Sequence, residues 1–179
     1  AYTAINVSSP NTPGLRMLHE RSRLADLLAA LKAAPGGAEA RLMLKVSPDL
    51  SPSELDDVVM VAHEQQIAGL IATNTTTARD GLSSSAPAEG GLSGAPLKAR
   101  SDEVLRGLYR SCDEQMVLIG VGGVFSGRDL YDKLAAGAHL AQIYTGFVYL
   151  GPGAGALILG ELLSLLGDRR VSDVRGCNA

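Results

Sequence analysis

A short apolar run near the start of the chain ends in a cluster of polar residues. From Ile5 to Leu15 the sequence reads Ile-Asn-Val-Ser-Ser-Pro-Asn-Thr-Pro-Gly-Leu, with amides and hydroxyls crowded around two prolines. This pattern is typical of a buried strand that ends in a loop, which the prolines stiffen by fixing φ. A stiff loop that carries amides and hydroxyls can hold a small polar ligand. An ordinary Asn/Pro turn would explain the same residues, so this loop alone leaves both readings open.

A single lysine, Lys45, stands inside the apolar stretch Leu42–Val46. A buried charge is costly unless it is paired. Lys45 therefore either reaches water at the end of a strand or faces a ligand that carries negative charge.

Two glycine-containing segments late in the chain indicate a phosphate site. Gly120–Gly123 is followed by Ser126, which suits the first residue of a helix, and Tyr144–Gly146 adds further N–H groups and a hydroxyl. Backbone N–H groups of a glycine-rich loop before a helix bind phosphate. A tight turn would explain the first segment alone, but the pair favours phosphate. With Lys45 as a nearby cation, such a site fits flavin mononucleotide (FMN).

The elements that would position these residues alternate between strands and helices. Ser51 and Glu54 form a capping box, and Pro52 lies at the first helical position between them. Residues 74–99, rich in Gly, Ser, Ala and Pro, predict an active-site loop, and the residues after Gly167 are expected to be loose. Apolar runs predict strands over 4–7, 42–46, 69–73, 117–121 and 140–144. Helical spacing predicts helices around 24–34, 52–62, 102–112, 126–136 and 156–166.

Five such units predict a parallel α/β sheet covered by helices. An open doubly wound sheet and a (β/α)8 TIM barrel both fit, but every strand is followed by polar residues. A barrel brings all of its strand ends to one mouth, so we favour the barrel. Five units are three short of closure. Because barrel phosphate sites follow strands seven and eight, the chain is expected to be the C-terminal part of an incomplete barrel.

Composition narrows the function classes. The net charge is −3 over 179 residues, which gives no footprint for nucleic acid, and no apolar run approaches the roughly 20 residues of a membrane span. Cys112 and Cys177 lie far apart, and neither they nor the three histidines show metal-ligand spacing. The chain by itself is therefore expected to be soluble and cytoplasmic, with no metal.

These residues resemble a known family, dihydroorotate dehydrogenase, and specifically its class 2, quinone-linked branch. The resemblance covers nearly the whole chain, and the order and spacing of the motifs also match. The matching segments are Asn6–Leu15, Lys45–Leu50, Thr73–Thr76, Gly90–Leu97, Gly120–Val124 and Gln142–Phe147.

The resemblance implies FMN-dependent oxidation of (S)-dihydroorotate to orotate in pyrimidine biosynthesis, with electrons passing to a quinone. Ser9 would be the catalytic base that takes the C5 proton while hydride moves from C6 to flavin N5. Class 1 relatives have a cysteine where Ser9 stands, so the serine favours class 2. A serine is a weak base at neutral pH, and it needs a dry site and a proton relay.

The resemblance also implies which residues bind. The substrate would contact Asn6, Asn11, Asn74 and Thr75. The flavin would contact Asn6, Lys45, Thr73, Ser93, Gly94, Gly122, Gly123, Tyr144 and Thr145.

Parts of the family pattern have no counterpart in these residues. They are the first three strands, with a lysine segment that contacts substrate and flavin, and the N-terminal helices that bind membrane. The complete protein is therefore expected on the cytoplasmic face of a membrane, or on the mitochondrial inner membrane in a eukaryote. Open barrel edges predict self-association. Two alternatives stay open: a non-catalytic partial barrel, and another FMN barrel such as a dihydropyrimidine dehydrogenase-like domain, which is expected to carry cysteine at position 9.

Overall fold

The computed structural model of the chain describes residues 1–12, 14–80, 82 and 89–179. Pro13 of the first polar loop, and residues 81 and 83–88 of the expected active-site loop, lie outside the described residues. The described chain contains a parallel sheet in which each strand pairs with the next one along the sequence. Its strands are β1 (Thr3–Asn6), β2 (Leu42–Val46), β3 (Gly69–Ala72), β4 (Val117–Val121) and β5 (Leu140–Gln142).

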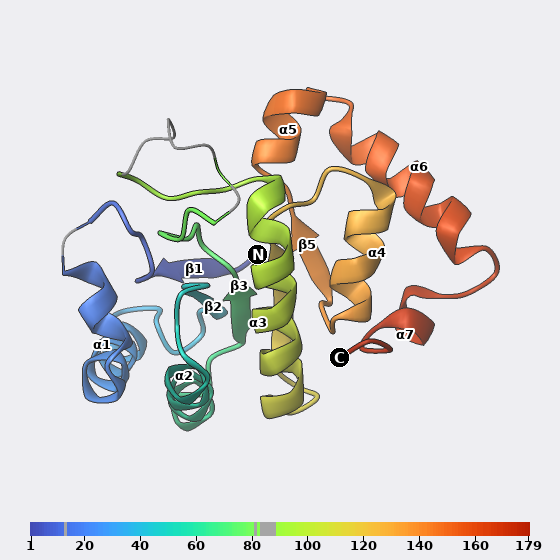
Figure 1. The fold of residues 1–179 in the computed structure, drawn as a ribbon. Coiled ribbons are helices and arrows are strands. Elements are labelled where there is room, and N and C mark those ends of the chain that lie inside the picture. Colours follow the sequence, from blue (N-terminus) through green and yellow to red (C-terminus); the bar gives the residue numbers. More distant parts are fainter. Residues whose placement is uncertain (13, 81, 83–88) are drawn as a thin grey trace.

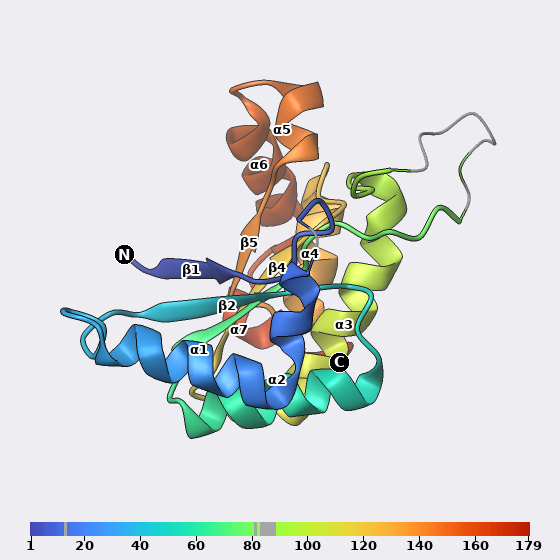
Figure 2. The same ribbon diagram turned by 90° about the vertical axis from the view of Figure 1, so that its left-hand side faces the viewer.

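Helices cover one face of this sheet (Figures 1 and 2). They are α1 (Arg21–Ala33), α2 (Pro52–Glu64), α3 (Lys98–Ser111) and α4 (Gly127–Ala135), each placed between consecutive strands. A doubly wound sheet reverses its strand order and carries helices on both faces. The unreversed order and one-sided cover are those of a barrel wall, as predicted.

The covered face holds the main hydrophobic core. Leu44, Leu70 and Leu118 occupy matching positions on β2, β3 and β4 and are at most 1% exposed. They pack with Leu28 of α1 and Leu105 of α3, both fully buried. Burying a side chain of this size contributes about 1.5–3 kcal/mol, so this face carries most of the packing energy.

The opposite face of the sheet is the inner wall of the barrel sector. Met43, Ile71 and Ile119 form a small cluster there, while Leu140 on β5 is 56% exposed. Side chains alternate between the faces of a strand, so Lys45 lies on the same face as Met43. This places the charged residue of β2 on the inner wall.

Two helix starts follow the sequence prediction closely. The Ser51 hydroxyl accepts from the Glu54 N–H at 3.3 Å, and the Ser51 N–H donates to the Glu54 carboxylate at 2.7 Å, which completes the capping box. At α4, the Ser126 hydroxyl accepts from the Asp129 N–H at 3.2 Å. Both caps satisfy N–H groups that a helix start leaves unpaired.

Several element boundaries differ from the prediction, including β1, which spans Thr3–Asn6 and not residues 4–7. Helix α3 begins at Lys98, not near residue 102, because the 3-10 helix η2 (Ala95–Leu97) leads directly into it. Pro96 is tolerated there since a first helical turn needs no N–H from it. Strand β3 ends at Ala72, and β5 ends at Gln142 because helix α5 (Thr145–Leu150) starts soon after it. The remaining helices are η1 (Leu15–His19), α6 (Ala154–Leu166) and α7 (Val171–Val174).

The C-terminal residues are docked, which corrects the expectation that they are loose. Val174 of α7 is 1% exposed and packs with Leu134, Leu162 and Leu166. The Gly176 N–H donates to the Leu134 carbonyl at 3.0 Å. Apolar burial in α7 and backbone pairing therefore hold the tail against α4 and α6.

Candidate active site

A cavity lies at the carboxyl ends of the strands. Strand β2, the loop after β3, the segment before η2, the loop after β4 and the end of β5 all contribute to its walls. Its lining residues are Lys45, Thr73, Asn74, Thr75, Ser93, Gly94, Leu97, Val121, Gly122, Gly123, Val124, Gln142, Ile143, Tyr144, Thr145 and Gly146. The structure thus brings together all the residues predicted for flavin contact except Asn6, and two of those predicted for substrate.

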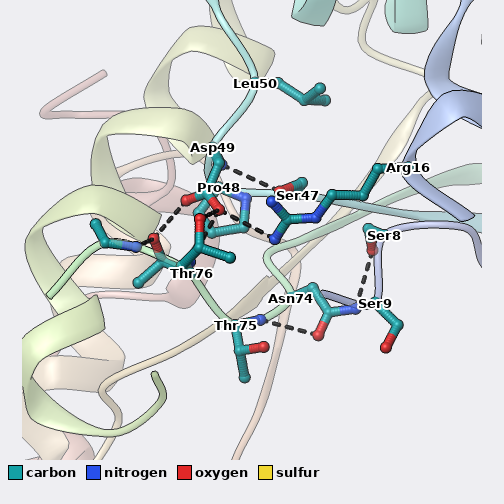
Figure 3. A network of polar contacts seen from close by, with 12 residues as sticks. Ser8, Ser9, Arg16, Ser47, Pro48, Asp49, Leu50, Asn74, Thr75 and Thr76 are labelled. Atoms are coloured by element: carbon teal, nitrogen blue, oxygen red, sulfur yellow. Dashed lines mark hydrogen bonds and ion pairs between the residues drawn. The ribbon is translucent and has the colours of Figure 1, made fainter. Parts of the chain in front are cut away.

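Asn6 joins this group through a hydrogen bond to Asn74. The Asn74 amide nitrogen donates to the Asn6 side-chain oxygen and to the Ser8 hydroxyl, both at 3.0 Å. The Asn74 oxygen in turn accepts from the Thr75 N–H at 2.9 Å (Figure 3). Ser8 is fully buried, so this cluster ties the end of β1 rigidly to the end of β3.

Ser9 and Asn11 lie outside the cavity lining, on the loop that follows β1. The Ser9 hydroxyl oxygen accepts from the Asn11 N–H at 3.3 Å, and Ser9 is half-buried. Asn11 is exposed and borders a shallow hollow with Pro10, Glu89 and Gly90. The predicted base is therefore close in the chain to the Asn6–Asn74 cluster, but it occupies the rim of the site.

The described part of the 74–99 loop returns over this rim. Thr76 and Leu92 pair as an antiparallel bridge, with N–H to carbonyl distances of 3.1 and 2.7 Å. At Gly91 the approach is so close that an added Cβ would lie 1.9 Å from the Thr75 hydroxyl oxygen and 2.9 Å from Pro10 Cγ. Only glycine fits at position 91. The contact holds the segment around Gly91 against the loops that carry Thr75 and Pro10.

Lys45 provides the positive charge of the cavity. It is half-buried on the inner wall, where it lines the cavity with Thr73. Burial lowers its pKa below the ordinary lysine value, because removal from water disfavours the ammonium form. A ligand with negative charge would relieve this cost, which is the arrangement expected for an anion-stabilising cation.

Gly122 and Gly123 bring backbone directly to the cavity wall. Gly123 has φ of 72°, and an added Cβ would lie 2.3 Å from the Lys98 Cβ. The next residues are fixed by Asp129, whose carboxylate accepts from the Phe125 N–H at 3.0 Å and the Ser126 hydroxyl at 2.9 Å. The loop is therefore held in place and is bare of side chains at Gly122 and Gly123, an arrangement that suits a backbone phosphate site.

The loop before η2 and the end of β5 meet at the same wall. The Thr145 hydroxyl donates to the Ser93 hydroxyl at 2.8 Å, and a Cβ on Gly94 would lie 3.2 Å from Thr145 Cγ2. Tyr144 is 78% exposed and stands at the rim. Ser93, Gly94 and Thr145 thus form one continuous surface next to the Gly122–Gly123 loop.

A carboxylate behind the cavity connects three strand-end loops. Asp49, after β2, accepts from the Thr77 N–H and hydroxyl, each at 2.9 Å, and from the Thr76 hydroxyl. Arg16 of η1 forms an ion pair with the same carboxylate at 3.0 Å (Figure 3). Burial acts to raise the pKa of Asp49, but the hydrogen bonds from Thr76 and Thr77 and the Arg16 charge outweigh it, so the pKa lies below its usual value.

Several of these residues were not assigned a role from the sequence. Ser8 and Asp49 both stand in motifs that the sequence singled out, but nothing in their spacing says that they bond across loops. Gln142 lines the cavity, and its amide donates to the Tyr2 hydroxyl at 2.7 Å, which links the end of β5 to the residue just before β1. The sequence could have indicated a role for Gln142, because it is a polar residue at the end of a predicted barrel strand.

Among the described residues, no three His, Cys, Asp or Glu side chains gather closely enough to hold a metal ion. In the same part of the chain, none of the helices has the length and apolar character needed to cross a membrane.

Comparisons with known proteins show the family of the chain. Residues 1–166 match the family model described as dihydroorotate dehydrogenase. A dihydroorotate dehydrogenase (quinone) of Myxococcus xanthus is 48% identical, and the match covers 98% of this chain and 50% of the relative. A protein of the same name from Thermus thermophilus is 50% identical, and the match covers 97% of this chain and 49% of the relative. The ferulenol complex of the Eimeria tenella enzyme superposes with a TM-score of 0.88 at 36% identity, covering 99% of this chain and 54% of that one. The chain spans about half the length of the curated relatives it matches.

Proposed function

Because the chain belongs to the dihydroorotate dehydrogenase family, we propose that it is the C-terminal part of the FMN-binding barrel of a quinone-linked enzyme of this kind. The complete protein would oxidise (S)-dihydroorotate to orotate in pyrimidine biosynthesis. The observation that carries this proposal is the single cavity in which Lys45, the Asn74–Thr75 loop and the Gly122–Gly123 loop meet. In it a cation, amides and bare backbone face one another at the ends of parallel strands.

The residues present fit an FMN group. Gly122 and Gly123 line the cavity with backbone alone, and Thr145 adds a hydroxyl to the same lining, which suits the phosphate. Lys45 lies on the inner wall, where its charge would face the electron-rich end of the isoalloxazine ring. When bound, FMN supplies the hydride acceptor for the reaction.

The substrate would be held by the amide cluster. Asn6 and Asn74 bond to each other, so their remaining donors and acceptors are presented in a fixed geometry. Dihydroorotate carries a carboxylate and ring amides, so an asparagine can donate to the carboxylate and ring carbonyls and accept from the ring N–H groups. Asn11 and Thr75 would complete the clamp from the two sides of the Gly91 contact.

Ser9 would act as the base for the C5 proton. In the overall reaction the substrate loses that proton and the C6 hydride, and a C5–C6 double bond forms. The hydrogen bond from the Asn11 N–H to the Ser9 oxygen orients the hydroxyl and would stabilise negative charge as it develops. Ser9 is half-buried and lies outside the cavity lining, so water would have to be excluded from it during the transfer.

The electron acceptor is inferred from the relatives. The Myxococcus xanthus and Thermus thermophilus relatives are named dihydroorotate dehydrogenase (quinone). A quinone dissolves in the lipid bilayer, so we infer that the complete protein works at a membrane surface.

The proposal is tested on the complete protein, including whatever residues flank these 179. It should carry visible flavin absorbance, and anaerobic dihydroorotate should bleach it. Ser9→Ala should keep the flavin and bind orotate but lose about 100- to 10,000-fold in the rate of bleaching, the usual contribution of a positioned base. The matched control Ser164→Ala, at an exposed hydroxyl of α6, should leave the rate unchanged.

Three outcomes would contradict the proposal. A colourless protein that takes up no added FMN would indicate a non-catalytic partial barrel. A flavoprotein that dihydroorotate does not bleach would indicate a different FMN enzyme. Equal rates for Ser9→Ala and the parent would remove Ser9 as the base.

A further inference from the structure

A fully buried lysine lies behind the Gly122–Gly123 loop. Lys133 of α4 has no exposed surface, although lysine is rarely buried without a partner. Its side chain packs under β4, where a Cβ on Gly120 would lie 3.0 Å from Lys133 Cδ. Lys133 lines no part of the cavity, so the proposed reaction gives it no direct role.

The charge of Lys133 is balanced by an aspartate of the neighbouring helix. Its ammonium group lies 2.6 Å from the Asp102 carboxylate of α3, which is 5% exposed. Lys98, one turn earlier on α3, pairs with the same carboxylate at 3.0 Å and with Asp132 of α4 at 2.9 Å. Burial lowers the pKa of Lys133, and the Asp102 charge counteracts this by favouring the ammonium form. These ion pairs fasten α3 to α4 at the level of the loop.

Ser101 connects this ion pair to the loop. The Lys133 ammonium donates to the Ser101 hydroxyl oxygen, so the single hydroxyl proton is left to donate elsewhere. The carbonyl of Gly122 at 3.2 Å and that of Lys98 at 3.0 Å share this one proton. Ser101 is fully buried, so no water competes for these contacts.

Residues of α3 contact the Gly122–Gly123 loop on the side away from the cavity. Ser101 engages a carbonyl oxygen, and Lys98 packs against Gly123, where an added Cβ would overlap it. Both contacts reach the loop from the side of α3, and the loop also lines the cavity. A peptide plane whose carbonyl is held from behind has its orientation fixed, and with it the direction of the adjoining N–H groups.

We propose that the buried Lys133–Asp102 pair, acting through Ser101, positions the Gly122–Gly123 loop for a phosphate and so sets the preference of this cavity for FMN over riboflavin. This inference rests on the proposed function. Lys133 and Ser101 are positioning residues in it, because neither lines the cavity. Riboflavin has the same ring system as FMN without the phosphate, so the ratio of the two affinities isolates the contribution of the loop.

The test measures the affinity of the flavin-free complete protein for FMN and for riboflavin by quenching of flavin fluorescence. In Lys133→Met the FMN affinity should fall at least about tenfold, the scale of one or two hydrogen bonds to a charged group, while riboflavin affinity changes little. Ser101→Ala should shift the ratio in the same direction, and it carries the test alone if Lys133→Met does not fold. The double variant should lose little more than Lys133→Met, because both changes break one connection.

A matched control is Lys32→Met on α1. The Lys32 ammonium also donates to a backbone carbonyl, that of Gln65 at 2.8 Å, but it lies away from the cavity. The ratio should be unchanged in this variant. Suppose that the parent protein binds FMN more tightly than riboflavin. The inference would be overturned if Lys133→Met and Ser101→Ala then lowered the affinity for both flavins equally, or changed neither affinity. Equal parent affinity for both flavins would overturn it too. A parent that binds neither flavin would refute the proposed function itself.

Discussion

Replacing Asp49 by asparagine should destabilise the protein and loosen the substrate side of the cavity. The carboxylate accepts hydrogen bonds from the Thr76 hydroxyl and from both the N–H and the hydroxyl of Thr77, and it pairs with Arg16. Asparagine keeps the shape but offers one acceptor oxygen and no charge. The loops after β1, β2 and β3 would therefore lose their common anchor together.

The magnitude follows from the type of each contact. Hydrogen bonds to a charged group contribute about 1.5–3 kcal/mol and neutral ones about 0.5–1.5, so the loss of charge costs about 1 kcal/mol for each bond that persists. The Arg16 pair adds at most about 1 kcal/mol, because both side chains are partly exposed. Since such contributions are not additive, we expect about 2 kcal/mol for Asp49→Asn. We expect about 3–4 kcal/mol for Asp49→Ala, which leaves the buried Thr76 hydroxyl without this acceptor.

Urea unfolding followed by far-ultraviolet circular dichroism measures this loss, since the sequence contains no tryptophan to report it. The matched control is Asp168→Asn, at an exposed aspartate beyond α6. The pKa of Asp49 is lowered in the folded protein, so its contribution is complete above about pH 4 and is lost as the pH falls through the folded-state pKa. The difference in unfolding free energy between the parent and Asp49→Asn should therefore become smaller below about pH 4. A variant that matches the parent at neutral pH, or a gap that widens in acid, would refute this reasoning.

Three further changes test other parts of the structure. Lys45→Met should stabilise the flavin-free protein at pH 7, because it removes a partly buried charge. This gain in stability, measured as the urea midpoint, should shrink as the pH rises toward the ordinary lysine pKa. An unchanged urea midpoint at pH 7 would argue against burial of that charge. Gly91→Ala should displace Thr75 and weaken orotate binding more than FMN binding in paired titrations; equal losses would point to general unfolding instead. Ser51→Ala should lower the unfolding free energy by about 1 kcal/mol through loss of the capping box, and an unchanged urea midpoint would show that this cap is dispensable.

The sequence was sufficient for the repeating βα units because each strand is a short apolar run bounded by polar residues. Leu42–Val46 and Val117–Val121 have the predicted bounds, and the Ser51 cap fixes the start of α2. These signals are local, so no knowledge of distant partners is needed. The grouping of Lys45 with the glycine loops also followed, since parallel strands bring their carboxyl ends to one edge.

The remaining features depend on contacts between distant residues. Residues 145–150 are rich in aromatic and β-branched types, which favour strand, but they form α5, where Gly146 fits closely against the Val124 carbonyl. The links of Ser8 to Asn74 and of Asp49 to Thr76 join loops far apart in the sequence. Neither residue type nor spacing encodes such partners, so these links required the structure.

The match between strand order and chain order bears on how the protein reaches its native state. Each strand from β2 to β5 pairs with the strand that precedes it in the sequence. A chain leaving the ribosome can therefore add the units from β2 to β5 one at a time to an existing edge, and none of these four strands waits for a partner made later. Loop-closure entropy stays modest at each addition, which favours rapid assembly and limits the time that an apolar edge spends exposed to aggregation. On this view β5 docks after β4, and the hydrogen bond from Gln142 to Tyr2, next to β1, would report that these five units have assembled.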